Sequence, residues 1–312
     1  MKIVFLDAAT MGEDISLSSI ESLGELVCWP STPGEDVKER IKEADIVITN
    51  KVVITKDSID SAPNLKLICV AATGTNNVDI EYAGKKGIPV RNAVGYSTES
   101  VLQITFTLIL GLLSKLKYFD NYVKDGSYSS SGIYTNVKEI FCEIKGKKFG
   151  IIGMGNIGSR VASVASAFGA EICYYSTSGT NHCVEYPSVS LKELLSGSDI
   201  VSIHAPLNPA TNNLISLEQM GWMKKNAILI NMGRGGIVNE KDLAYAIDNG
   251  LIAGAGVDVF VKEPFDSDHP YMMMEHKERV LFTPHIGWAS AEARKRVVEI
   301  VTSNIRTFIG KS

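Results

Sequence analysis

Short apolar runs alternate with amphipathic segments along the chain. In the first third, the pattern predicts strands at Lys2–Leu6, Ile46–Thr49, Leu67–Ala71 and Pro89–Arg91, and helices at Glu35–Glu43 and Tyr82–Lys86. The rhythm repeats further on, with predicted strands at Lys148–Ile152, Glu171–Tyr175, Ile200–His204, Ala227–Asn231, Gly256–Val259 and Val280–Phe282, and helices between them at Ser159–Phe168 and Asp242–Ile247. This order predicts an α/β protein with two doubly wound parallel sheets.

Two longer helices are predicted at the junctions of these halves. One begins near Thr98 and runs to about Tyr118, and the other covers Ala291–Ile309. We expect both to cross between the halves, and the final helix to return to the first half. The polar stretch Asp125–Gly132 between the two rhythms is predicted to be a surface loop.

A glycine motif, Gly153-Met154-Gly155-Asn156-Ile157-Gly158, follows the predicted strand at Lys148. Gly153 permits a sharp turn, Gly155 lets the backbone approach a pyrophosphate, and Gly158 lets the helix pack closely on the strand. The free N–H groups of a helix N-terminus favour phosphate. Glycine turns are common, but the strand–turn–helix context favours a dinucleotide site.

Composition narrows the class of protein. The chain has 312 residues, 45% hydrophobic and 21% charged, with a net charge of −4, which argues against nucleic acid or an anionic membrane as a main partner. The start shows no secretion leader, and the apolar stretch Val101–Leu113 is too short to span a bilayer. Five scattered cysteines without CxxC spacing fit reduced thiols, and no metal site is indicated. We expect a cytoplasmic protein.

Three titratable side chains follow predicted strands of the second half. Arg234, Glu263 and His285 each come shortly after a strand end, where ligands bind in an open parallel sheet. A guanidinium can grip a carboxylate with two prongs, and an imidazole can give a proton to a carbonyl oxygen. A carboxylate on the other imidazole nitrogen fixes its tautomer. Together they suit the interconversion of a 2-keto acid and a 2-hydroxy acid.

Each of these residues has an alternative interpretation when taken alone. Arg234 could be a solvated turn residue, although three neighbouring glycines indicate close backbone approach. Glu263, before a proline, could lie in a surface turn. His285 could be a structural histidine, hydrogen-bonded in the core. Their joint arrangement after three strands favours the catalytic interpretation.

The chain resembles the D-isomer-specific 2-hydroxyacid dehydrogenases over nearly its whole length, and within them the bacterial glycerate dehydrogenases, also called hydroxypyruvate reductases. The matching motifs are AATGTNNVD at 71–79, GMGNIG at 153–158, YYSTSG at 174–179, NMGRGGIVNE at 231–240, GAGVDVF at 254–260, EP at 263–264 and TPHIGWAS at 283–290. The resemblance implies a discontinuous flavodoxin-like substrate domain (1–97 with 290–312), a Rossmann-type dinucleotide-binding domain (98–289), NAD as cofactor, and a homodimer.

The resemblance also implies roles for single residues. Arg234 would bind substrate, His285 would act as acid and base, and Glu263 would pair with the histidine. For the substrate carboxylate it implies the backbone N–H groups of Thr73 and Gly74, and for the wall of the pocket Trp288, whose alternative role is core packing. The residues it implies for cofactor binding are Thr105, Gly153, Gly155, Asn156, Ile157, Gly158, Ser176, Pro206, Thr211, Met232, Gly233 and Asp258, with Asp258 near the nicotinamide amide.

Some positions depart from the family pattern. Ser176 stands where many members carry an aspartate for the ribose hydroxyls, yet Ile172–Glu185 contains no Arg or Lys to attract a 2′-phosphate, and His182 is the only partial cation there. We therefore favour NADH, with NADPH left open. Leu102 and Ile104 replace smaller or polar residues near the expected hinge and put cofactor-side packing in question, while Thr105 remains available for a phosphate. His204 is expected to be structural.

These patterns predict an oxidoreductase that moves a hydride between NAD(H) and a small D-2-hydroxy acid or 2-keto acid, with hydroxypyruvate or glyoxylate as the favoured substrate. One alternative is a D-lactate or phosphoglycerate dehydrogenase; a phosphorylated substrate needs further cations, and Lys51 at a strand end is one candidate. A second alternative is a non-catalytic NAD-sensing binding protein, like the corepressors that share this fold.

Overall fold

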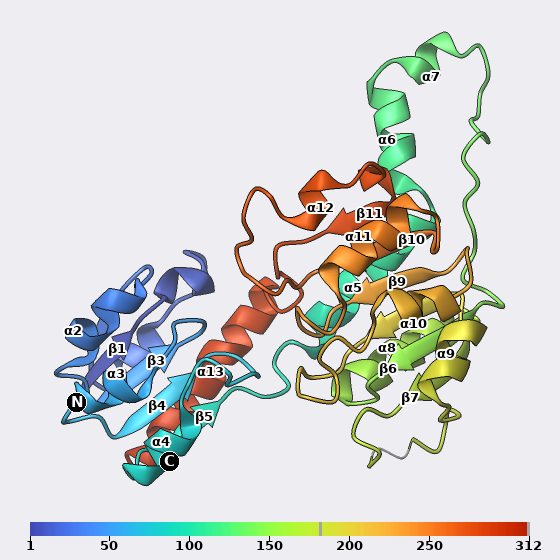
Figure 1. Cartoon of the computed structure of the whole chain (residues 1–312). Coiled ribbons are helices and arrows are strands. Elements are labelled where there is room, and N and C mark those ends of the chain that lie inside the picture. The colour runs from blue at the N-terminus through green and yellow to red at the C-terminus, as the bar shows by residue number, and fades with distance from the viewer. Residues whose placement is uncertain (181–182, 311–312) are drawn as a thin grey trace. The chain divides into compact units, whose positions relative to one another are not determined.

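The computed structural model describes residues 1–180 and 183–310, and the chain divides into two compact units. Unit 1 comprises Met1–Ser97 with Trp288–Ser312, and unit 2 comprises Thr98–Gly287 (Figure 1). Each unit contains one sheet in which every paired strand is parallel to its neighbour. The predicted class, α/β with two parallel sheets, is confirmed.

The sheet of unit 1 has five strands in the order β2-β1-β3-β4-β5. Its strands alternate sides with period two: Ile3 and Phe5 of β1 enter the core on one face, and Val4 enters the core on the other. The strands are β1 (Lys2–Phe5), β2 (Glu25–Cys28), β3 (Ile46–Thr49), β4 (Leu67–Val70) and β5 (Val90–Asn92).

Helices cover both faces of this sheet. The C-terminal helix α13 (Ala291–Phe308) returns to unit 1, where its apolar side, including Val297, Val301 and Ile305, is buried with Ile3 and Phe5. Ser290 caps it by accepting from the Ala293 N–H at 3.2 Å. The other helical segments are α1 (Ser18–Glu21), α2 (Val37–Ile41), α3 (Lys56–Asp60) and α4 (Ile80–Lys85), with 3₁₀ turns η1 (Ala8–Met11) and η2 (Gly34–Asp36).

The sheet of unit 2 has six strands in the order β11-β10-β9-β8-β6-β7. The chain passes from β6 outward to β7 and then back to β8 on the other side of β6. Such a reversal creates a crevice at the carboxyl ends of the strands, which is where doubly wound sheets bind ligands. The strands are β6 (Lys148–Ile152), β7 (Glu171–Tyr175), β8 (Ile200–Ile203), β9 (Ile228–Asn231), β10 (Gly254–Val257) and β11 (Val280–Phe282).

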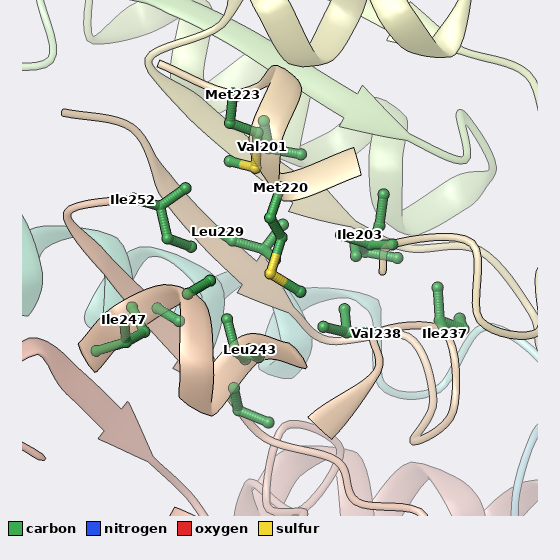
Figure 2. Packing of buried hydrophobic residues seen from close by; sticks show 14 of the residues in the cluster. Val201, Ile203, Met220, Met223, Leu229, Ile237, Val238, Leu243, Ile247 and Ile252 are labelled. Atoms are coloured by element: carbon green, nitrogen blue, oxygen red, sulfur yellow. The ribbon is translucent and has the colours of Figure 1, made fainter. Parts of the chain in front are cut away.

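Two apolar layers enclose this second sheet. On one face α9, α10 and α11 pack over Val201, Ile203 and Leu229 of the strands, and Figure 2 shows Met220 and Leu243 from two of these helices in the same packed cluster as Leu229. On the other face α5 and α8 pack against the sheet. The helical segments are α5 (Thr98–Leu113), α6 (Leu116–Lys124), α7 (Ser127–Ser130), α8 (Asn156–Ala167), α9 (Leu191–Gly197), α10 (Leu217–Trp222), α11 (Glu240–Asp248) and α12 (Pro270–Met273), with the 3₁₀ turn η3 (Lys277–Arg279).

The prediction of one helix from Thr98 to Tyr118 is wrong. Helix α5 ends at Leu113, Lys115 has a left-handed φ of +53°, and α6 continues at an angle of 64°. The reason is burial: the apolar face of α5 packs in the core as far as Leu112, whereas no residue of α6 is buried. Within the described residues, no single helix is long and apolar enough to cross a membrane, and the bent α5–α6 pair meets the criteria of length and composition only.

Smaller differences arise where the apolar signal is weak. The edge strand β2 was not predicted, because its four residues are half-buried or exposed and its pattern is mixed. The predicted loop at 125–132 contains the short helix α7, none of whose residues is buried. The named strands and the other named helices agree with the structure to within two residues at each end, except that α8 begins at Asn156, three residues before the predicted start at Ser159.

Candidate active site

The glycine motif forms a turn after β6 whose three glycines meet different constraints. Gly153 has a φ of +93°, and a Cβ there would lie 2.8 Å from the Ala205 nitrogen. A Cβ on Gly158 would overlap the Gly153 carbonyl, so this glycine lets α8 pack against the turn. Nothing lies within 4 Å of a Cβ built on Gly155. The turn is therefore tight on the protein side and open at Gly155.

Two further features of this edge suit a dinucleotide. Helix α8 begins directly after Gly155 without a side-chain cap, so its first N–H groups are available to a phosphate. Ser176 directly follows β7, and its Oγ is buried without a hydrogen-bond partner in the described structure. A buried hydroxyl without a partner at the position predicted to contact the ribose, and an open glycine turn, both fit the cofactor. His182, the partial cation considered above, lies outside the described residues.

The loop after β8 closes on itself. Thr211 is buried, its Oγ1 donates to the Pro206 carbonyl at 2.6 Å, and it accepts from the Asn208 N–H at 2.8 Å. Thr211 therefore holds the loop, while Pro206 is exposed at its surface. A contact of Pro206 with the cofactor stays a prediction, and Thr211 would act through the loop.

The expectation for Thr105 needs correction. Its side chain is completely buried in α5, and its Oγ1 donates to the Val101 carbonyl at 2.7 Å, so the hydroxyl is not open to a phosphate. Threonine inside a helix commonly bonds back to the carbonyl four residues earlier. Leu102 and Ile104 pack against the same apolar layer that contains Met154 of the glycine turn.

His204, at the end of β8, is predicted to make stability acid-sensitive. Its Nε2 lies 2.8 Å from the Ser202 Oγ, its Nδ1 is buried without a partner in the described structure, and burial lowers the pKa of the ring from 6.5 to about 3. Between these values the unfolded chain binds a proton that the folded chain does not. The contribution of neutral His204 to the free energy of unfolding is therefore fully present above pH 6.5. It falls as the pH drops toward 3, by at most about 1.4 kcal/mol per pH unit.

Urea unfolding from pH 7 to 4.5 should show this slope of the free energy of unfolding in the wild type and a smaller slope in His204→Asn. The partly exposed His276, changed to Asn, serves as control, and an equal slope in all three proteins would contradict the assignment.

At the other end of the same sheet edge, the loops after β10 and β11 bring Glu263 and His285 together. The Glu263 Oε2 lies 2.6 Å from the His285 Nδ1, and its Oε1 accepts from the Phe260 N–H at 2.9 Å. The side chains are 31% and 18% exposed, so the pair is shielded but reachable. This geometry leaves Nε2 as the ring nitrogen for a substrate.

Asp258 fixes the loop that carries the imidazole. Its buried carboxylate accepts from the Thr283 Oγ1 at 2.6 Å, the Ile286 N–H at 2.9 Å and the Gly287 N–H at 2.9 Å. Its carbonyl accepts from the His285 N–H at 2.8 Å, and His285 itself has a left-handed φ of +53°. Burial raises the pKa of Asp258, while these hydrogen bonds oppose the shift. The predicted contact with the nicotinamide amide stays a prediction.

Arg234 belongs to a third loop, which follows β9. The Asn231 side chain spans this loop: its Oδ1 accepts from the Gly233 N–H and its Nδ2 donates to the Arg234 carbonyl, both at 3.1 Å. Arg234 donates from Nη1 to the Gly233 carbonyl at 2.8 Å. A Cβ on Gly235 would overlap the Phe260 carbonyl group, so the Arg234 loop lies directly against the Glu263 loop.

The remaining predicted substrate residues belong to unit 1. Thr73 follows β4; its carbonyl accepts from the Asn92 Nδ2 at 2.6 Å, and its Oγ1 donates to the Ala93 carbonyl at 3.1 Å. Gly74 is the next residue. Trp288 packs edge-on against Tyr96, with ring centroids 6.4 Å apart. Among the described residues, no group of three or more His, Cys, Asp or Glu side chains could hold a metal ion.

Sequence reasoning missed three residues that order this edge: Asn231, Gly235 and Glu240. Asn231 and Gly235 act through the Arg234 loop as described above. The Glu240 Oε1 accepts from the Val261 N–H at 2.9 Å. All three lie in NMGRGGIVNE, but the motif alone gives no sign of a polar residue reaching a backbone group 21 positions away.

The profile of the D-isomer specific 2-hydroxyacid dehydrogenase NAD binding domain matches residues 106–287, nearly all of unit 2. The chain belongs to this family. It is 35% identical to a hydroxypyruvate reductase of Blautia hydrogenotrophica, covering 99% of this chain and 97% of that one, and 34% identical to a glycerate dehydrogenase of Methylorubrum extorquens, covering 99% and 96%. The protein is a 2-hydroxyacid dehydrogenase, an oxidoreductase that uses NAD.

Solved structures with this fold are similar to the chain over nearly its whole length. The TT0316 protein of Thermus thermophilus superposes with a TM-score of 0.89 at 29% identity, covering 99% of this chain and 97% of that one. The D-lactate dehydrogenase of Aquifex aeolicus, complexed with NAD and lactic acid, superposes with a TM-score of 0.86 at 27% identity, covering 99% and 96%. The family thus contains enzymes for more than one 2-hydroxy acid.

Proposed function

We propose that this dehydrogenase reduces a small 2-keto acid to the D-2-hydroxy acid with NADH, and that its substrate is hydroxypyruvate or glyoxylate. The observation that carries the proposal is the 2.6 Å contact between Glu263 and His285, held beside the Arg234 loop. The substrate class is supported by the similar hydroxypyruvate reductase and by a 35% identical glyoxylate reductase of Thermococcus litoralis.

His285 is assigned the proton transfer. The Glu263 carboxylate accepts from the Nδ1–H, which stabilises the imidazolium and directs Nε2 to the substrate. In reduction, Nε2 gives its proton to the carbonyl oxygen of the keto acid; in oxidation, it takes the proton back. The bound cofactor supplies or accepts the hydride.

Arg234 is proposed to bind the substrate anion, because a guanidinium can form two parallel hydrogen bonds with a carboxylate or a polarised carbonyl. The backbone N–H groups of Thr73 and Gly74 are proposed as further donors to the carboxylate, and Trp288 as a wall of the site. These assignments rest on the family motif. In the structure, Thr73 follows a strand of the unit 1 sheet, and the residues of unit 2 follow strands of its own sheet.

Cofactor binding is assigned to unit 2. Gly153, Gly155, Asn156, Ile157 and Gly158 would hold the pyrophosphate, Ser176 the ribose, Pro206 the adenosine half, and Met232, Gly233 and Asp258 the nicotinamide half. We propose NADH over NADPH, because the segment 172–185 carries no Lys or Arg to pair with a 2′-phosphate.

A substrate panel tests the proposal. NADH and NADPH oxidation would be followed with hydroxypyruvate, glyoxylate, pyruvate and phosphohydroxypyruvate, and we expect the highest kcat/KM for NADH with hydroxypyruvate or glyoxylate. Faster turnover of pyruvate or phosphohydroxypyruvate would favour the lactate or phosphoglycerate alternative. Tight NADH binding with no turnover of any keto acid would favour a sensing role.

We also propose that the enzyme is a homodimer joined through its arm, defined as residues 116–142. The arm exposes large apolar side chains, including Leu116 at 63%, Tyr134 at 90% and Ile140 at 78%, and Figure 1 shows α6 and α7 standing away from the unit 2 sheet. Several large apolar side chains exposed on one short segment are typical of an interface. We expect a solution mass of two chains for the wild type and of one chain for Ile140→Asp; a monomeric wild type would contradict the proposal.

We also propose a cytoplasmic location, which is supported by the five cysteines that form no disulfide bond.

A further inference from the structure

We propose that Glu240 is a positioning residue for the reaction: paired with His269, it fixes the loop that carries Glu263 and so aims the imidazole of His285. The inference rests on the proposed function, because it concerns the aim of the same proton-transfer pair. Neither Glu240 nor His269 needs to touch the substrate or the cofactor.

Glu240 joins three segments of unit 2. It is the first residue of α11, its Oε1 accepts from the Val261 N–H at 2.9 Å, and its Oε2 lies 3.0 Å from the His269 Nε2. The side chains of Glu240 and His269 are only 14% and 9% exposed. A pair this well shielded from water holds its geometry more firmly than a surface pair does.

The hydrogen bonds of His269 define its tautomer. Its Nδ1 accepts from the Tyr271 N–H at 3.3 Å, so the ring proton is on Nε2 and is donated to Glu240. The ring stacks on Phe265 with centroids 4.4 Å apart and lies 4.8 Å from the Tyr271 ring. The imidazole is therefore fixed in both position and orientation, and it presents a single donor to the carboxylate.

The path from Glu240 to the reacting group is short. Val261, which Glu240 holds, follows Phe260, and the Phe260 N–H donates to the Glu263 Oε1 at 2.9 Å. The other side of the loop is limited by Gly235, whose missing Cβ leaves room for the Phe260 carbonyl. Between these two constraints the loop has little freedom, and Glu263 passes its position on to His285 over 2.6 Å.

A purely structural role predicts something different. A carboxylate in the first turn of a helix stabilises it through the helix dipole. Loss of that effect would lower the melting temperature and leave the kinetic parameters of the folded enzyme unchanged. The positioning role instead predicts a change in kcat and in the pH profile at a temperature where the variant is fully folded.

The test is Glu240→Gln, measured as kcat, KM and pH profile with NADH and the best keto acid. The Gln amide oxygen can still accept from Val261, but its NH₂ group then meets the donor Nε2–H of His269, so the pair separates. Displacements of about 1 Å at an active site cost on the order of a hundredfold. We therefore expect kcat to fall about ten- to a hundredfold, with KM for NADH nearly unchanged and the limb of the kcat/KM profile due to His285 displaced. Tyr271 also faces Glu240 and stays neutral throughout, because burial raises its pKa.

Two further variants make the test specific. Lys262→Ala breaks the exposed Lys262–Asp266 pair on the same loop and should leave all parameters at wild-type values. Glu240→Gln combined with His269→Gln should be no worse than His269→Gln alone, because the second change removes a pair that the first has already broken. A wild-type kcat and pH profile for Glu240→Gln, with only a lower melting temperature, would overturn the inference.

One measurement needs no turnover. In NMR spectra, the Nδ1 proton of His285 should lose its low-field position in Glu240→Gln and keep it in Lys262→Ala. If wild type and Lys262→Ala both fail to reduce any keto acid, the proposed function is wrong. The positioning role of Glu240 is then tested by this resonance alone: its loss in Glu240→Gln supports the role, and its retention contradicts it.

Discussion

Replacing His285 with alanine is expected to lower kcat for keto-acid reduction by roughly 10²- to 10⁴-fold, the usual contribution of a general acid. The variant keeps the glycine turn and the Asp258 hydrogen bonds, which use the Thr283 hydroxyl and backbone groups of the His285 loop. The dissociation constant of NADH should therefore change little. Steady-state kinetics of folded protein, with NADH binding followed by fluorescence, measures both quantities.

Glu263→Gln and His276→Gln are the comparisons for this prediction. The first keeps the size of the side chain but removes the charge that favours the imidazolium, so we expect a kcat between those of the wild type and His285→Ala. The second changes a partly exposed histidine that also pairs with a glutamate, Glu278, and should leave kcat unchanged. A His285→Ala enzyme with wild-type kcat would remove the imidazole from the mechanism.

Gly235→Ala is expected to produce the second large loss, although it adds only one methyl group. Its Cβ would overlap the Phe260 carbonyl carbon and oxygen and approach the Val261 nitrogen, all backbone atoms that cannot swing aside. The Glu263 loop must shift away from the Arg234 loop, and a shift of about 1 Å costs on the order of a hundredfold in kcat/KM. Overpacking of this kind also lowers stability by about 1–3 kcal/mol. Keto-acid kinetics and urea unfolding would measure the two effects.

The matched control is Gly221→Ala in α10. Nothing lies within 4 Å of a Cβ built there, and alanine favours a helix, so this variant should be at least as stable as the wild type and fully active. A Gly235→Ala enzyme with unchanged kinetics would show that the contact between the two loops does not position the site.

Much of the fold could be predicted from the sequence because the strands are buried on both faces and read as apolar runs. β3, β4, β8 and β9 are buried along their whole length. The break between α5 and α6 could not be predicted, because Lys115 is an ordinary helix former and the helix stops only where the core beneath it ends. The edge strand β2 is half-exposed and lacks the apolar signal.

The proximity of two of the predicted site residues could also be inferred from the sequence. Glu263 and His285 are 22 residues apart, and each follows a strand of a parallel sheet, so strand-end reasoning places them on one edge. The predicted phosphate contact of Thr105 was wrong, because the side chain lies on the face of α5 that packs against the sheet and is buried there. The sequence did not indicate which face of the helix that would be. Glu240 and His269 were missed because their pairing depends on the path of the 260–269 loop, which has no periodicity to interpret.

The most direct test of the central claim is a single turnover of wild-type enzyme, mixed with stoichiometric NADH and an excess of hydroxypyruvate or glyoxylate. We predict loss of the near-ultraviolet absorbance of the reduced nicotinamide, formation of one equivalent of the D-2-hydroxy acid, and a rate that depends on His285. Full occupancy by NADH with no absorbance loss for either keto acid would contradict it.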